Sequence, residues 1–159
     1  AAGVGIYAMT VRRDTAASSA GATGDNATLN TDDLGRTWTR GGDPCQDHAR
    51  VTTAAIDTTT SGNVELVALT STNVIYVCGY EVISTAAQAF QWIYVTGTAC
   101  GTGETDISGP EAFAANGGIA KANAGAVQFK TAASNALCIE TGGTGQVSGY
   151  VTYVKTAAP

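Results

Sequence analysis

Cys45 and His48 come closest, by type and spacing, to a nucleophile and its base. The chain's one histidine stands in Asp47-His48-Ala49-Arg50, three residues after Cys45. A catalyst of this kind needs thiol and imidazole within hydrogen-bond reach and a third group that orients the base. Pro44 beside Cys45, at the start of a new segment, favours an exposed turn. We therefore expect a loop histidine here and no Cys–His catalyst.

Carboxylates could support glycoside hydrolysis by an acid pair or calcium binding by an acidic loop. The candidates after residue 44 are Glu65, Glu81, Glu104, Asp106, Glu111 and Glu140. Their spacing forces no two of them into one cleft, and Glu104-Thr105-Asp106 is typical of an exposed loop. The glycine-rich stretches 101–103 and 142–145 lack the lysine of a phosphate-binding loop, which indicates turns. We predict no enzyme, no metal and no cofactor.

Four cysteines are spread at wide intervals as Cys45, Cys78, Cys100 and Cys138. None forms a Cys-x-x-Cys pair, which argues against a zinc site. Their even number in a Thr- and Gly-rich chain favours two disulfides, with three possible connectivities. Four buried free thiols, acting as small apolar side chains, are the alternative. Disulfides would indicate a working life outside the cytosol.

Aromatic side chains could bind sugar rings if they are exposed. The candidates are Tyr76, Tyr80, Trp92, Tyr94, Tyr150 and Tyr153. Phe90, Trp92 and Tyr94 alternate along one stretch and therefore share one face of a strand. In a small β domain such a row is typical of the core or of a subunit contact. We expect core or interface for this row, with a carbohydrate platform as the alternative.

The composition points to β structure and away from several partners. Charged residues make up only 13% of the 159 residues, and Ala, Gly and Thr dominate, as suits strands joined by tight turns. The net charge of −5 argues against nucleic acid, because phosphate binding needs clustered Lys and Arg. No stretch approaches the roughly 18 apolar residues of a membrane helix, so we expect no membrane partner.

Residues 1–44 differ from the rest of the chain and are predicted to form an extended anchoring arm. The segment is polar, with too little apolar surface to bury a core of its own. The residues expected to contact a partner are Arg12, Arg13, Arg36, Trp38 and Arg40. The planar arginine fork suits such contacts because it can meet carboxylates with two hydrogen bonds. A flexible leader is the alternative.

Residues 45–159 are predicted to form one β domain organised around the stretch 74–95. Two β-branched and aromatic runs, 74–83 and 90–95, flank a small-residue connector, which is typical of a β-hairpin. Further strands are expected at 49–56, 64–69, 126–131, 136–140 and 146–154. The fold class predicted from this spacing is all-β, an antiparallel β-sandwich that is jelly-roll-like, with the extended arm in front.

The sequence resembles small virion proteins of tailed bacteriophages. The leader carries Arg13-Asp14-Thr15 and then a Gly-Asp-rich stretch, 24–38, that ends in a Gly35-Arg36 turn. Matching pieces of the second part are 74–80, 97–103, 108–110, 134–138 and 149–153. The resemblance implies a non-enzymatic β-sandwich on the surface of an extracellular particle, as a capsid decoration or a head or tail fibre. It also implies an anchoring arm, other virion proteins as partners, and a homo-oligomer, with a trimer favoured.

Two functions therefore follow from the sequence. The first is a virion structural protein, held on the particle surface by residues 1–44. The second is a carbohydrate-binding or adhesin module that recognises host glycans through exposed aromatic rings. A hydrolase would need an activity that depends on one carboxylate or on His48.

Overall fold

The computed structural model describes residues 10–12, 29–31, 43–47, 49–122 and 125–157. The chain divides into two units, Ala1–Gly41 and Gly42–Pro159, and each is described by itself. In the first unit, strand β1 (Thr10–Arg12) pairs in parallel with β2 (Leu29–Thr31). The second unit holds all the other described strands, and it begins with a short 3₁₀ helix, η1 (Pro44–Gln46).

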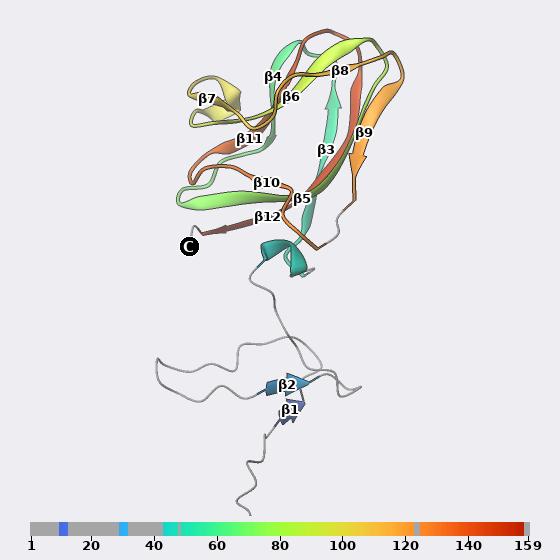
Figure 1. Ribbon diagram of the computed structural model, residues 1–159. Coiled ribbons are helices and arrows are strands. Elements are labelled where there is room, and N and C mark those ends of the chain that lie inside the picture. The colour runs from blue at the N-terminus through green and yellow to red at the C-terminus, as the bar shows by residue number, and fades with distance from the viewer. Residues whose placement is uncertain (1–9, 13–28, 32–42, 48, 123–124, 158–159) are drawn as a thin grey trace, which may run out of the picture. The chain divides into compact units, whose positions relative to one another are not determined.

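Two antiparallel sheets form the second unit (Figure 1). Sheet I has the order β10-β5-β12-β3, with β9 also paired to β5. Its strands are β3 (Thr52–Thr58), β5 (Asn73–Ser84), β9 (Gly117–Lys121), β10 (Phe129–Lys130) and β12 (Val147–Ala157). Sheet II has the order β4-β11-β6-β7, with β8 also paired to β6. Its strands are β4 (Gly62–Val67), β6 (Gln88–Val95), β7 (Glu104–Asp106), β8 (Glu111–Phe113) and β11 (Ala136–Thr141).

The strand pairs are nested along the chain, as in a jelly roll. The first long strand, β3, pairs with the last, β12, and β4 pairs with β11. Inside these, β5 pairs with β9 and β10, and β6 pairs with β7 and β8. This is a long folded hairpin rolled into two packed sheets. The predicted all-β, jelly-roll-like sandwich is confirmed.

The predicted hairpin over residues 74–95 is wrong in its pairing. Both strands exist, but β5 lies in sheet I and β6 in sheet II, so residues 85–87 carry the chain across the sandwich. Ser84 and Gln88 close this corner, because the Gln88 amide donates to the Ser84 hydroxyl at 2.6 Å and to the Gly145 carbonyl at 3.0 Å. Both strands are richly apolar, and the structure buries their inner faces against each other across the core.

Aromatic and β-branched side chains from both sheets fill the space between them. The rings of Tyr80 (β5) and Trp92 (β6) meet edge to face, with centroids 5.0 Å apart. Phe129 from β10 lies against both rings, at 5.9 and 5.1 Å. The aliphatic members of this core are Ile56, Val67, Ile75, Val77, Val82, Leu137, Ile139, Val147 and Val151. Their burial supplies the main favourable term for folding.

The strand predicted at 146–154 is confirmed as β12, and its side chains alternate between the two faces of the sheet. Val147 and Val151 face the core, while Tyr150 and Val154 face the other way. One irregularity lies opposite this strand, where the register of β12 against β5 shifts between Thr152 and Tyr153. The shift leaves Cys78 as an extra residue in β5, which is the local signature of a β-bulge.

Several local predictions differ from the structure, because glycine-rich or very short strands show no clear alternation of apolar and polar residues. A turn with Asn116 at φ 61° leads directly into β9, where no strand was predicted. Residues 104–106, expected as a loop, form β7, and residues 111–113 form β8. The strand expected over 126–131 is limited to Phe129–Lys130.

Both predicted disulfides are present, as Cys45–Cys78 and Cys100–Cys138, and the described residues include no free cysteine. Cys45 lies in η1 and is fully buried, so the exposed turn expected around it is wrong for this residue. Cys100 ends η2 (Thr98–Cys100), a short 3₁₀ turn. Each bond ties a 3₁₀ segment to the outer face of a central strand, β5 in sheet I and β11 in sheet II.

Removing one of these bonds should destabilise the domain without changing its fold. The linked cysteines are 33 and 38 residues apart, and cross-links of this length typically contribute about 2–4 kcal/mol. We expect Cys100→Ala/Cys138→Ala to lower the free energy of unfolding by that amount in urea denaturation. Cys45→Ala/Cys78→Ala is the matched comparison and should lose a similar amount. An unchanged midpoint in either double variant would contradict this.

Candidate functional site

The cysteine–histidine pair considered above cannot act as a catalyst. The Cys45 sulfur is bonded to Cys78, and a disulfide sulfur is not a thiolate nucleophile. His48 lies outside the described residues. The Asp43 carboxylate is also committed, since it accepts hydrogen bonds from the backbone N–H groups of Cys45 and Val127, both at 2.9 Å. These bonds fix η1 and the chain before β10 onto sheet I.

Two of the candidate carboxylates fasten neighbouring segments to β4. Glu104 accepts from the Asn63 amide at 2.6 Å, and Glu65 accepts from the backbone N–H of Ala99 at 3.0 Å. Both bonds hold the η2 region against β4. Within the described part of the chain, no three His, Cys, Asp or Glu side chains lie close enough to hold a metal ion. The segment considered as a calcium loop, Glu104 to Asp106, forms strand β7, which pairs with β6.

Two open depressions of similar size lie on the outer faces of the sandwich. One, of about 290 Å³, lies on sheet I and is lined by Glu81, Ile83, Asn116, Gly118, Ile119 and Ala120. The other, of about 300 Å³, lies on sheet II and is lined by Ala89, Phe90, Gln91, Pro110, Glu140 and Gly142. Each contains one carboxylate, whereas a glycosidase needs two facing one bond. Neither depression therefore holds the pair of carboxylates that a glycosidase of this kind uses.

The structure separates the six candidate aromatic residues by exposure. Trp92 is 1% exposed, Tyr80 7% and Tyr76 8%, and Tyr94 and Tyr153 are half-buried. The core prediction is therefore confirmed for Phe90 and Trp92. Trp92, which a glycan platform would have used, cannot touch a sugar. Tyr150 is 43% exposed and is the candidate ring that a ligand could reach.

The outer face of sheet I is covered over one half only. Around Cys78, the disulfide, Val154, Val51 and Val127 form a small buried cluster beneath η1. Beyond the bulge, none of the described residues forms such a cover over the same face. We call this second part the open half-face; its residues are Ala55, Asp57, Glu81, Ile83, Gly118, Ala120, Ser148 and Tyr150, which the strand registers place side by side.

Sheet II repeats the arrangement with a different surface. The Cys100–Cys138 bond lies in a cluster with Ile93, Val95 and Ala136, so η2 covers this half. The uncovered half holds the second depression, where Gln91 is 8% exposed and no large apolar side chain is exposed. The two uncovered halves thus differ, because among the described residues the exposed aromatic ring, Tyr150, belongs to sheet I.

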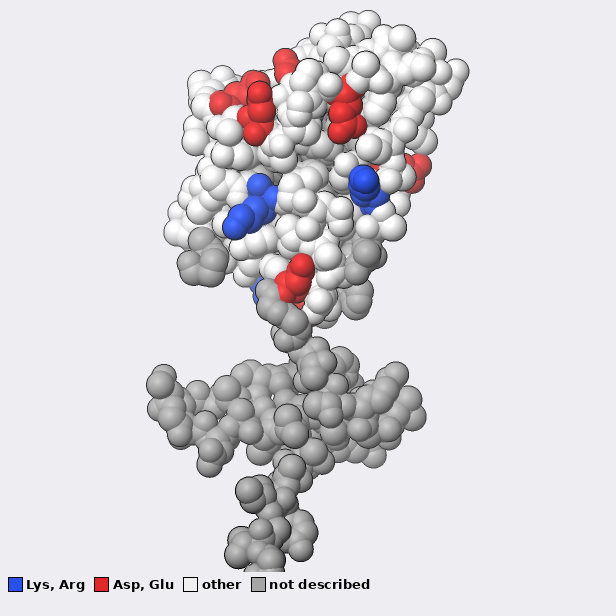
Figure 2. Space-filling view, in the orientation of Figure 1, with Lys and Arg blue, Asp and Glu red and all other residues white. Residues whose placement is uncertain are grey.

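Charged side chains are scattered on the face of the second unit shown in Figure 2. Lysine and arginine side chains lie apart from one another, acidic groups lie mainly above and below them, and large areas are uncharged. On this face no single sign of charge forms a continuous stripe. Among the described residues, no helix is long and apolar enough to cross a membrane.

The residues predicted to anchor the arm are not brought together by the described structure. Arg12 ends β1, and Arg13, Arg36, Trp38 and Arg40 lie outside the described residues. Their role stays a prediction. Sequence reasoning also did not single out Ile83, because its place diagonal to Tyr150 depends on the pairing of β12 with β5.

Searches against protein-family models, curated proteins and solved structures give no match for this chain.

Tyr80 makes the stability of this core depend on pH. Burial raises the pKa of its hydroxyl, and the carboxylate of Glu111 adds to the effect. The folded state therefore holds this proton more tightly than the unfolded state, so stability must fall as the pH rises past the ordinary tyrosine pKa of about 10. We expect Tyr80→Phe to flatten that fall in urea titrations between pH 8 and 11. Equal slopes for both proteins would show that Tyr80 does not carry the effect.

Proposed function

We propose that this chain is a non-enzymatic structural protein of a virion, exposed on the surface of the particle as a capsid decoration or a fibre module. Residues 1–44 are the anchor, and residues 45–159 form the outward-facing sandwich. The observation that carries the proposal is the jelly roll with one disulfide-tied cover on each sheet. Such cross-links suit a protein that works outside the reducing cytosol.

The low share of charged residues, 13%, suits a module whose surface contacts other proteins. The resemblance of the leader to tailed-phage virion proteins also supports the proposal. In this proposal the partners are other virion proteins, and the chain forms a homo-oligomer, with a trimer favoured. The disulfides would close after release from the host cell, because the reducing poise of the cytosol opposes them before release.

Anchoring by the arm can be tested by deleting residues 1–40. Both sheets and both disulfides lie within 43–157, so the truncated protein should keep cooperative unfolding and its near-ultraviolet circular dichroism. We expect its occupancy on particles to fall at least about tenfold, since the arm contacts would be lost. Mass spectrometry of purified particles measures this.

Point variants separate the arm's arginines from a general loss of positive charge. Changing Arg36 and Arg40 together to Gln should lower occupancy, whereas Arg50→Gln, in the exposed turn before β3, should not. If the truncated chain is incorporated at the level of the intact one, the arm is not the anchor.

A second function, recognition of glycans, is favoured by one observation. Tyr150 is an exposed tyrosine on the half of sheet I over which no described segment lies. An aromatic ring on a flat, open surface can stack on the apolar C–H face of a sugar. The two functions are compatible, because a particle-borne module can also hold a host glycan.

A further inference from the structure

The open half-face gathers the exposed large apolar side chains of the described residues. These are Tyr150, 43% exposed, and Ile83, 40% exposed. Tyr150 lies opposite Glu81 in the β12–β5 ladder, and Ile83 lies opposite Ser148. The two are therefore diagonal neighbours on one face, which is within reach for an aromatic side chain. Together they make a single small apolar patch.

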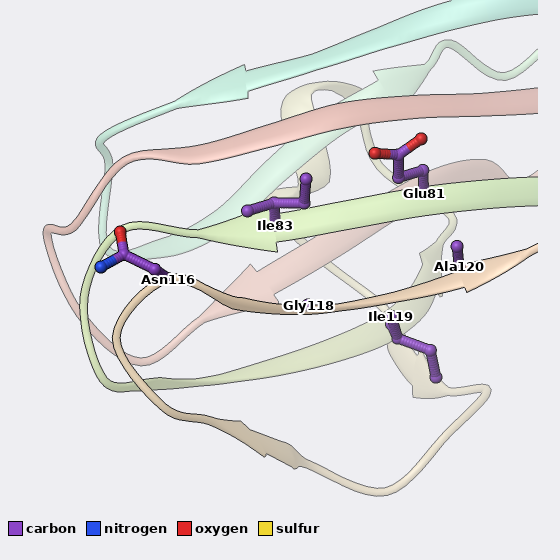
Figure 3. Close-up of a pocket in the computed structure, with 6 residues that line it drawn as sticks. All are labelled: Glu81, Ile83, Asn116, Gly118, Ile119 and Ala120. Carbon is purple, nitrogen blue, oxygen red and sulfur yellow. The ribbon is translucent and has the colours of Figure 1, made fainter.

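Two polar side chains border this patch and are unengaged. Glu81 and Asn116 line the same depression, and neither side chain has a hydrogen bond to another described residue. Figure 3 shows Glu81 and Ile83 rising from one face of β5, Asn116 at the end of the depression, and Ile119 pointing the other way. The carboxylate accepts hydrogen bonds, and the amide can both donate and accept.

The floor between these groups is kept low by small residues. Gly118 lies so close to β5 that an added Cβ would meet the Val82 carbonyl oxygen, so no side chain can project there without moving the strand. Ala120, Ser148 and Ala55 continue the floor on the neighbouring strands. A flat ring could therefore lie on this surface beside the ring of Tyr150.

A second copy of this chain is a poor occupant. A stable protein interface buries about 800 Å² on each partner, whereas this patch offers two partly exposed apolar side chains and a depression of about 290 Å³. In a two-fold dimer centred here, Glu81 would also approach its own copy. The depression is near the lower end of the size range of small-molecule sites.

Charge indicates which small ligand fits. Glu81 and Asp57 both belong to the open half-face, and none of its residues is Lys or Arg. An anionic sugar would be repelled, whereas a neutral sugar offers hydroxyl donors to a carboxylate. Hydrogen bonds to charged groups are the stronger ones.

From these observations we infer that the open half-face is a binding site for one neutral hexose ring. The inference rests on the second proposed function and assigns it a place and a sugar class. The apolar face of the sugar stacks on Tyr150 and touches Ile83, while its hydroxyls donate to the Glu81 carboxylate. A lone ring held this way should bind on the order of millimolar.

Saturation-transfer NMR on the full chain tests this with five probes. They are the methyl glycosides of glucose, galactose, mannose and N-acetylglucosamine, with N-acetylneuraminic acid as the anionic member. We expect transfer to at least one neutral hexose and none to N-acetylneuraminic acid. Tyr150→Ala and Glu81→Gln should each weaken binding about tenfold or more.

Two controls separate loss of the site from loss of the fold. Tyr150→Phe keeps the ring and should bind within about threefold of the unaltered chain. Glu140→Gln removes the matching carboxylate in the depression of sheet II and should bind unchanged. Circular dichroism and urea unfolding should show every variant folded.

The outcomes distinguish the site from the function. Hexose binding that survives both Tyr150→Ala and Glu81→Gln would overturn the site while leaving glycan recognition standing. Preference for N-acetylneuraminic acid would overturn the neutral sugar class. No transfer to any probe, together with no binding on a glycan array, would overturn both the site and the second function.

Discussion

Tyr80 and Trp92 meet across the two sheets, and this contact explains much of the architecture. The rings come from β5 and β6, which follow each other in the chain. Because these strands face each other across the core, they cannot pair edge to edge. Each must find its hydrogen-bonding partners elsewhere, in β9, β10 and β12 for β5 and in β7, β8 and β11 for β6. The nested jelly-roll pairing follows from that choice.

The outer faces of the sheets also carry apolar side chains, and these must be buried as well. Cys78, Val154 and Ile93 point outward yet are fully or almost fully buried, and η1 and η2 provide their cover. The disulfides fix η1 and η2 in place. The outer face of each sheet therefore has one half that is buried under a 3₁₀ segment and one half that no described segment covers. The uncovered halves therefore present the side chains of the outer sheet faces that a partner can reach.

Features that depend on local periodicity, such as the direction of side chains along a strand, can be predicted from the sequence. Features that depend on residues far apart in the chain, such as strand pairing, cannot. Alternation in 147–154 correctly separates Val151 from Tyr150, because the pleat alone sets the direction of each side chain. The partner of β5 could not be read in the same way, since a hairpin and a crossover share the same local pattern. Likewise, four cysteines allow three connectivities. Strand β9 was hidden by Gly117 and Gly118, and with it the floor of the open half-face.

Disulfide mapping of the purified chain tests the arrangement of covers and sheets most directly. Trypsin is unsuitable, because no Lys or Arg lies between Cys78 and Cys100. Cleavage after Glu65, Glu81, Glu104 and Glu140 puts the four cysteines on separate peptides. Under non-reducing conditions, the structure predicts two cross-linked pairs, Cys45 with Cys78 and Cys100 with Cys138. A Cys45–Cys100 or Cys78–Cys138 peptide, or four free thiols, would contradict the account.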